Sequence, residues 1–175
     1  MSKQYPKAGG GEGADGPGGI AGDKMVRNGT LEKKNCVIFY SCNPVRHVFG
    51  VGFYVNSVFL LNILRFEPVN DRLCWIRVHE KYRNYSIINA HAPTEDKDDE
   101  EKDKFYLELE TVYSQCPRHD IKMVFGDFST KVGKEESNYP FAGRNGLHEE
   151  CNGNSYKLVH YHCNRRDYWG NYIYP

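Results

Sequence analysis

A strand–helix–strand pattern in the middle of the chain most constrains its fold. The segment "YSIINAHAP" is an apolar strand that stops at Pro93, and "IKMVF" (121–125) is a second one. Apolar residues recur between them at helical spacing, at Phe105, Leu109, Val112 and Cys116. Thr94 is the expected N-cap, acidic residues fill the first turns, and Pro117 ends the helix. The pattern predicts a layered α/β domain.

Further strands are expected before this unit, which predicts a mixed or antiparallel sheet ahead of the helix. Their segments are 36–40, 47–55, part of 57–69, and 73–78. Glycines within "HVFGVGFYV" indicate a bulge or close packing. After the unit, a loop is expected over 129–150 and a last helix over 154–163.

The two ends of the chain differ from its middle. Residues 1–30 are rich in Gly and offer little to bury, so they are expected to form a disordered tail. The domain covers 31–163, and 164–175 form a C-terminal tail. The N-terminus has no apolar signal core, and no apolar run is long enough to span a membrane. These features predict an intracellular protein, nuclear or cytoplasmic, whose six cysteines are reduced.

The charge of the chain is balanced, with 23 Lys and Arg against 23 Asp and Glu. Proteins held on nucleic acid mainly by charge show a basic excess, so a packaging role is disfavoured. The balance does not argue against an enzyme that touches nucleic acid only at its site. The acidic run "EDKDDEEKDK" contains interleaved lysines and fits a solvated helix start better than a metal or partner site.

Two predicted strands end in residues that could carry chemistry. Asn89 and His91 lie at the end of "IINAHAP", and Asp127 and Ser129 follow "MVFG". Catalytic groups collect at strand ends in layered α/β proteins, because rigid backbone meets an accessible cleft there. An Asp can accept a proton from water, and a His can donate one to a leaving or phosphoryl oxygen. The alternative is structural, since Asp after Gly is a common turn residue and Ser129 can cap a turn.

A second cluster, near the C-terminus, invites a zinc interpretation. It contains Cys151, His160, His162 and Cys163. Their spacing matches no common structural zinc site, and His160 and His162 would face different directions in a helix. They are therefore interpreted as ordinary helix and surface residues, and the metal ligands of the chain stay unknown.

Several segments resemble one family in order and spacing, among them "HVFGVGFYVN", "YSIINAHAPT", "DIKMVFGDFSTKVGKE" and "GRNGLHEECNGNSYKL". They resemble the endonuclease segment of RTE-type non-LTR retrotransposons and the proteins called craniofacial development protein 2-like, within the endonuclease/exonuclease/phosphatase superfamily. The resemblance covers 31–163, and "NAHAPT" followed by "GDF" is its most specific part. It implies a partial four-layer α/β/β/α sandwich, deoxyribonuclease I-like, with its N- and C-terminal strands missing.

The resemblance also implies a divalent-metal-dependent phosphodiesterase that acts on DNA. Asp127 matches a strand-end Asp that activates or orients the attacking water. His91 matches a residue that holds and polarises the scissile phosphate, and Asn89 on the same strand end is assigned to substrate binding. Magnesium would stabilise the charge that develops on the phosphoryl oxygens.

The chain departs from the family pattern in ways that predict an impaired or inactive domain. Ser129 stands where the family has Asn, so contact with phosphate and alignment of Asp127 should both suffer, and a misplacement of ~1 Å can cost ~100-fold in rate. The metal-binding Glu has no counterpart near 22–30, and a closing Asp-His pair is absent, so magnesium binding is expected to be poor. Missing strands leave sheet edges open to self-association. A non-catalytic interaction module and a phosphoesterase of the same superfamily remain alternatives.

Overall fold

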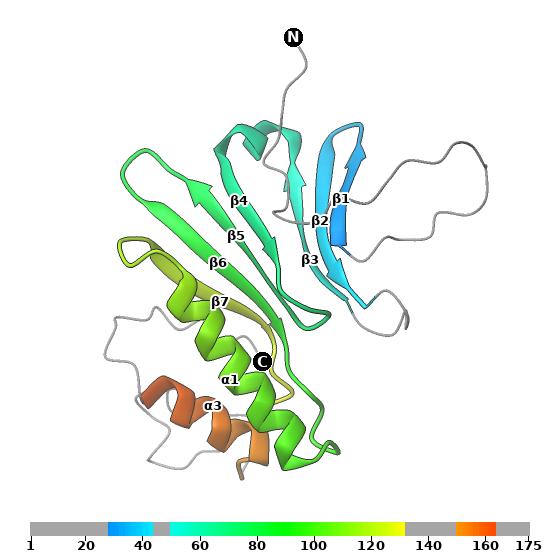
Figure 1. The fold of residues 1–175 in the computed structure, drawn as a ribbon, viewed down its shortest axis with the longest axis vertical. Coiled ribbons are helices and arrows are strands. Elements are labelled where there is room, and N and C mark those ends of the chain that lie inside the picture. Colours follow the sequence, from blue (N-terminus) through cyan, green and yellow to red (C-terminus); the bar gives the residue numbers. More distant parts are fainter. Residues whose placement is uncertain (1–27, 44–49, 132–149, 164–175) are drawn as a thin grey trace, which may run out of the picture. The chain divides into compact units, whose positions relative to one another are not determined.

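The computed structural model describes residues 28–43, 50–131 and 150–163 (Figure 1). These residues belong to two compact units. The first unit extends to Asn89 and includes Pro117–Val124, and the second combines Ala90–Cys116 with the residues from Phe125 onward. Several predictions lie outside the described residues, namely the tails at 1–27 and 164–175, the loop at 132–149 and the strand start at 47–49.

The described elements confirm the predicted α/β class. In chain order they are β1 (Asn28–Lys33), β2 (Cys36–Cys42), β3 (Gly50–Asn56), the 3-10 helix η1 (Ser57–Asn62), β4 (Ile63–Pro68), β5 (Leu73–His79), β6 (Asn84–His91), α1 (Asp99–Gln115), β7 (Ile121–Asp127) and α3 (Gly153–Cys163). One sheet has the order β1-β2-β3 and the other β4-β5-β6-β7. The pairs β1–β2, β2–β3 and β4–β5 are antiparallel, as predicted for the strands before the helix.

The first strand, β1, is the element that the sequence does not predict, and its first residues fall within the tail expected at 1–30. Its segment "NGTLEK" has one large apolar side chain, Leu31, which is 37% exposed. The strand instead pairs with β2 along its whole length, from Asn28↔Ser41 to Lys33↔Cys36. Backbone hydrogen bonds to β2 therefore define β1. Its side chains do not alternate between apolar and polar, so the sequence gives no sign of a strand.

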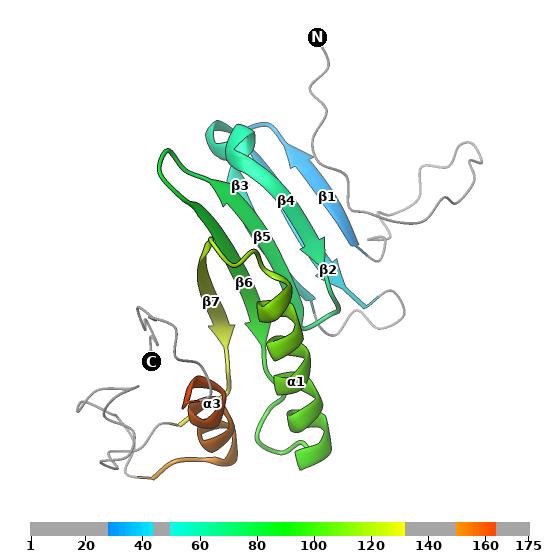
Figure 2. The same ribbon diagram turned by 60° about the vertical axis from the view of Figure 1, so that its left-hand side comes forward.

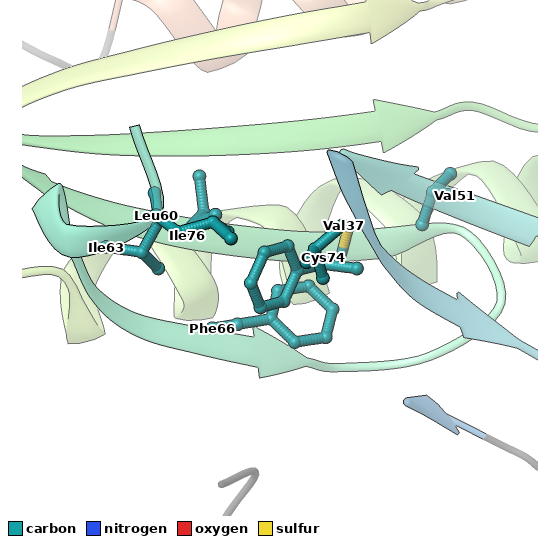
Figure 3. Close-up of a cluster of buried hydrophobic side chains, with 8 residues drawn as sticks. Val37, Val51, Leu60, Ile63, Phe66, Cys74 and Ile76 are labelled. Atoms are coloured by element: carbon teal, nitrogen blue, oxygen red, sulfur yellow. The ribbon is translucent and has the colours of Figure 1, made fainter. Parts of the chain in front are cut away.

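The core of the first unit lies between the two sheets, which pack face to face. Buried side chains from β2, β3, η1, β4 and β5 meet there (Figure 3), namely Val37, Phe39, Val51, Leu60, Ile63, Phe66, Cys74 and Ile76. The rings of Phe39 and Phe66 are 5.3 Å apart between centroids. At Gly52 a Cβ atom would overlap the carbonyl oxygen of Phe39, so the close packing predicted for this glycine-containing strand is confirmed.

The helix α1 begins later than the sequence predicts. Asp98, and not Thr94, is the N-cap, because its side chain accepts a hydrogen bond of 2.7 Å from the backbone N–H of Glu101. Thr94 instead belongs to a turn, in which its carbonyl accepts a hydrogen bond from Lys97. The predicted acidic start of the helix is confirmed, because three acidic residues lie in its first turn. The predicted apolar face is confirmed as well, because the residues at 105, 109, 112 and 116 are all buried.

The structure also bears on the cysteines and on the length of apolar helices. The described cysteines Cys36, Cys42, Cys74, Cys116 and Cys151 form no disulfide bonds. No helix among the described residues is long and apolar enough to cross a membrane.

A polar cluster ties β5 and β6 to the turn before β7 within the first unit. The Arg77 guanidinium donates to both carboxylate oxygens of Asp120, at 2.7 and 2.8 Å, and the Ser86 hydroxyl donates to the same carboxylate at 2.8 Å. The Asp120 side chain is only 2% exposed. Burial raises the pKa of Asp120, but hydrogen bonds from Arg77 and Ser86 and the charges of Arg77 and Lys122 outweigh it and hold that pKa below its ordinary value.

Replacing Asp120 by Ala is expected to destabilise the protein by about 3 kcal/mol, because it leaves Arg77 partly buried without its carboxylate. Chemical denaturation measures this change. Glu67→Ala is the matched control, since it removes the partner of Arg65 in an exposed ion pair and should cost below about 1 kcal/mol. Equal losses for the two variants would contradict the structural role of Asp120.

The stability that Asp120 contributes should depend on pH. A carboxylate whose pKa is lowered by folding contributes fully above its unfolded value, near 3.8, and loses that contribution as the pH falls toward its folded value. The wild-type protein should therefore lose stability over this acid range more steeply than Asp120→Asn. Denaturation curves recorded on both sides of the ordinary Asp pKa test this, and parallel pH profiles would refute it.

Candidate functional site

The ends of β6 and β7 are joined within the second unit. The backbone N–H of Ala92, just after β6, donates a hydrogen bond of 2.8 Å to the carbonyl oxygen of Asp127, the last residue of β7. His91 is the last residue of β6. The structure thus brings His91 and Asp127 to neighbouring strand ends, where the sequence predicts a catalytic pair.

The close approach of these strand ends requires a glycine at position 126. Gly126 has φ +149°, and a Cβ atom there would overlap the carbonyl oxygen of Ala90. Any other residue would therefore push β7 away from β6 or distort its backbone. Glycine is therefore a geometric requirement at position 126, and it sets the course of the backbone into Asp127.

Asp127 and Ser129 form a tight turn beyond β7. The Ser129 backbone N–H donates a hydrogen bond of 2.8 Å to Asp127 Oδ1, which is the pattern of an Asx turn. Ser129 has φ +49°, and among the described residues other than glycine it alone has a positive φ. The left-handed conformation costs most L-residues roughly 1–2 kcal/mol and is better tolerated by Asn than by Ser.

Two asparagines at the start of α3 hold this turn from the other side. Asn152 Nδ2 donates to the Ser129 carbonyl at 2.9 Å, and Asn154 Nδ2 donates to the Pro93 carbonyl at 2.9 Å. Asn152 also exchanges hydrogen bonds with the backbone of Lys131. Asn154 is fully buried, and its Oδ1 has no hydrogen-bond partner among the residues that the structure describes. These contacts connect the ends of both strands to one helix.

The N-terminus of α3 is capped by a carboxylate from the segment after β6. Glu95 accepts hydrogen bonds from the backbone N–H groups of Gly153 (3.1 Å) and Asn154 (3.2 Å). Lys102, a buried residue of α1, donates to the Glu95 carbonyl at 2.8 Å and lies 3.3 Å from its carboxylate. Burial raises the pKa of Glu95, but these backbone donors and Lys102 prevail and lower it. Glu95 therefore occupies two of the backbone donors that a helix N-terminus can offer to an anion.

Asn89 has a defined structural contact. It belongs to the first unit, where its side-chain Nδ2 donates a hydrogen bond of 2.7 Å to the carbonyl oxygen of Gly52 in β3. This bond links the two sheets of the unit. Substrate binding by Asn89 remains a prediction, as do the catalytic roles of His91, Asp127 and Ser129.

The described residues do not make a magnesium site by themselves. They contain no group of three His, Cys, Asp or Glu side chains that could hold a metal ion. At the strand ends they supply the Asp127 carboxylate, one oxygen of which already accepts the Ser129 N–H. Magnesium prefers octahedral oxygen ligands, commonly one or two carboxylates with waters and substrate phosphates.

The sequence did not point to the residues that hold the turn. Asn152 precedes α3 and accepts the Ser155 backbone N–H at 3.0 Å, as an N-cap does. The segment "NGNS" just before a predicted helix carries that capping signal. No local signal marks Glu95 as the partner of α3, because the two are 58 residues apart along the chain.

Replacing Ser129 by Asn should stabilise the protein by up to about 1 kcal/mol, because Asn tolerates the left-handed conformation better than Ser. Thermal unfolding measures the gain. Thr130→Asn is the control, since Thr130 does not have a positive φ, and it should give no comparable gain. An unchanged or lower midpoint for Ser129→Asn would contradict the strain inferred for this turn.

Comparison with known proteins yields similarity over part of the chain. No protein-family model matches it. Proteins named Craniofacial development protein 2, from Bos taurus and Tragulus javanicus, are each 29% identical to it over 118 residues. The match covers 67% of this chain and 20% and 21% of those relatives, so the chain spans about a fifth of their length. This similarity supports the resemblance to craniofacial development protein 2, while membership of the wider superfamily stays a prediction.

Proposed function

We propose that the chain is a retrotransposon-derived, endonuclease-like domain related to metal-dependent hydrolases of DNA, and that its own hydrolytic activity is impaired or lost. The observation that carries the proposal is the turn beyond β7. Asp127 is held at a strand end next to the end of β6, as a phosphodiesterase site would require, yet the residue that completes the turn is a strained Ser129. We also propose an intracellular location, nuclear or cytoplasmic.

The two strand-end residues retain the chemistry of their proposed roles. The Asp127 carboxylate can orient an attacking water or accept its proton, and the His91 imidazole can donate a hydrogen bond to a phosphoryl oxygen. A serine hydroxyl at position 129 replaces an amide that would both donate to phosphate and align the Asp. Positioning of the scissile phosphate is therefore the function that we expect to be weakest.

Magnesium, when bound, would supply charge stabilisation at the phosphoryl oxygens. Because the described donors are few, we propose that the chain binds this ion weakly. Hydrogen bonds within the chain hold this turn, since Asp127 accepts one from the Ser129 N–H and the Ser129 carbonyl accepts one from Asn152. This self-supported turn is compatible with the alternative proposal, a non-catalytic interaction module, and with self-association through sheet edges. A phosphoesterase activity of the same superfamily is a further alternative.

A plasmid-nicking assay tests the proposal. Purified protein is incubated with supercoiled DNA and magnesium, beside Asp127→Ala. Wild-type protein is expected to nick no faster than this variant, because phosphate positioning and metal binding are both deficient. Nicking that requires both magnesium and Asp127 would overturn the proposed loss of activity.

The same assay can locate the defect. If Ser129 limits activity, Ser129→Asn should nick faster than wild type, and Asp127→Ala in the same background should abolish the gain. Thermal unfolding of each variant confirms that it is folded. A gain that survives Asp127→Ala would show that the nicking does not come from this site.

A further inference from the structure

The 3-10 helix η1 presents exposed apolar side chains at one end of the first unit. Val58, Phe59 and Leu61 are 75%, 61% and 77% exposed, and we call these three residues the η1 patch. Leu60 between them is buried in the core. Because three residues complete one turn of this helix type, Val58 and Leu61 lie on the same side of it. Single exposed apolar residues are common, but several within one short segment indicate a binding surface.

Two turns of the chain are bonded to the two ends of η1 (Figure 2). The backbone N–H of Ser57, the first residue of η1, donates a hydrogen bond of 3.0 Å to the carbonyl of Asn35, in the turn between β1 and β2. The side chain of Asn62, the last residue of η1, donates one of 3.0 Å to the carbonyl of His79, where the turn between β5 and β6 begins. These bonds hold both turns beside the η1 patch.

The two turns carry four exposed basic side chains, namely Lys33, Lys34, Lys81 and Arg83. None of the four forms an ion pair with another residue that the structure describes. The segments that form the turns, 32–35 and 79–84, also contain Glu32 and Glu80, so their formal charge is +2 with His79 neutral, whereas the whole chain is neutral. The η1 patch is therefore flanked by cations that can meet an anionic partner.

Tyr82 adds an aromatic side chain to this surface. It is largely exposed, and the Lys81 ammonium lies 5.1 Å from the centre of its ring. A tyrosine has an apolar ring with a polar tip, and a lysine carries its charge at the end of an apolar stem. Both side chains therefore suit the boundary between hydrocarbon and water.

We propose that this end of the first unit binds the surface of an anionic lipid membrane. The η1 patch enters the boundary between lipid head groups and acyl chains, while the basic turns meet the lipid phosphates. The sequence predicts no membrane-spanning segment, and a contact with the membrane surface needs none. A protein in the proposed intracellular location would meet such a surface, because the cytoplasmic leaflet is anionic.

Other occupants fit this surface less well. The backbone of duplex DNA would meet the cations, but it offers no apolar partner to Val58 and Leu61. A second copy of the chain, docked through the same end, would bring the basic turns of both copies together. No residue of this surface belongs to the strand-end site, so the proposal stands or falls separately from the nicking assay.

Co-sedimentation with lipid vesicles tests the proposal on the full chain. Vesicles of phosphatidylcholine and phosphatidylserine in equal parts should retain the protein, and vesicles of phosphatidylcholine alone should bind it at least about tenfold more weakly. Leu61→Ser, which removes apolar surface, and the double charge reversal Lys33→Glu with Lys34→Glu should each weaken binding to the mixed vesicles at least about tenfold, or ~1.4 kcal/mol. Equal retention by both kinds of vesicle would overturn the proposal.

Matched controls separate this surface from general effects of charge and apolar area. Leu107→Ser removes an exposed leucine of α1, and Lys97→Glu with Lys104→Glu makes the same charge change in the second unit. Both controls should alter retention little, and thermal unfolding confirms that each variant is folded. If Leu107→Ser weakens binding as much as Leu61→Ser, or the two charge reversals act equally, the proposed surface is wrong.

A tryptophan at position 59 reports whether the η1 patch enters the lipid. The fluorescence of Phe59→Trp should shift to shorter wavelength when mixed vesicles are added, because the indole leaves water, and Leu107→Trp should show no such shift. The wild-type protein gives the background of Trp75 and Trp169. Retention without this shift would show binding by charge alone and contradict the proposal. Self-association in size-exclusion chromatography that Leu61→Ser abolishes, with vesicle binding unchanged, would assign the surface to a second copy instead.

Discussion

The close contact of two strand ends at Gly126 is the constraint on which the candidate site depends. A side chain at this position would overlap the Ala90 carbonyl, so only glycine lets β7 end beside β6. The hydrogen bond from Ala92 to Asp127 then fixes the residue that follows. Backbone contacts thus define this junction and place Asp127 beside the end of β6.

Beyond that junction, the structure compensates for a residue that is locally unfavourable. Ser129 adopts a left-handed conformation, which local preference opposes, and it persists because its N–H bonds to Asp127 and its carbonyl accepts the Asn152 amide. Strain of this kind concentrates at functional sites and is held by surrounding contacts. These contacts thus hold the turn in a defined shape, and a fold that is kept does not by itself establish an activity.

The sequence predicted most elements because their apolar patterns are local. The burial of β6 alternates as a half-buried strand should, and α1 buries the residues that its helical spacing indicated. The start of α1 and the strand β1 were not predicted correctly, because both depend on contacts with other parts of the chain. Thr94 has the chemistry of an N-cap, but so does Asp98, and only the three-dimensional course of the chain, with Glu95 bound to α3, decides between them. The strand β1 depends on its pairing with β2 and carries no pattern of its own.

By itself, the sequence determined the α/β class, the strand-end positions of His91 and Asp127, and the resemblance to craniofacial development protein 2-like proteins. These follow from short-range periodicity and from motifs that are contiguous along the chain. Tertiary structure alone decided the contacts that join distant segments: Asn152 and Glu95 at the start of α3, Asp120 with Arg77, and the two turns bonded to η1. Such contacts depend on where the folded backbone brings side chains together, which no local preference encodes.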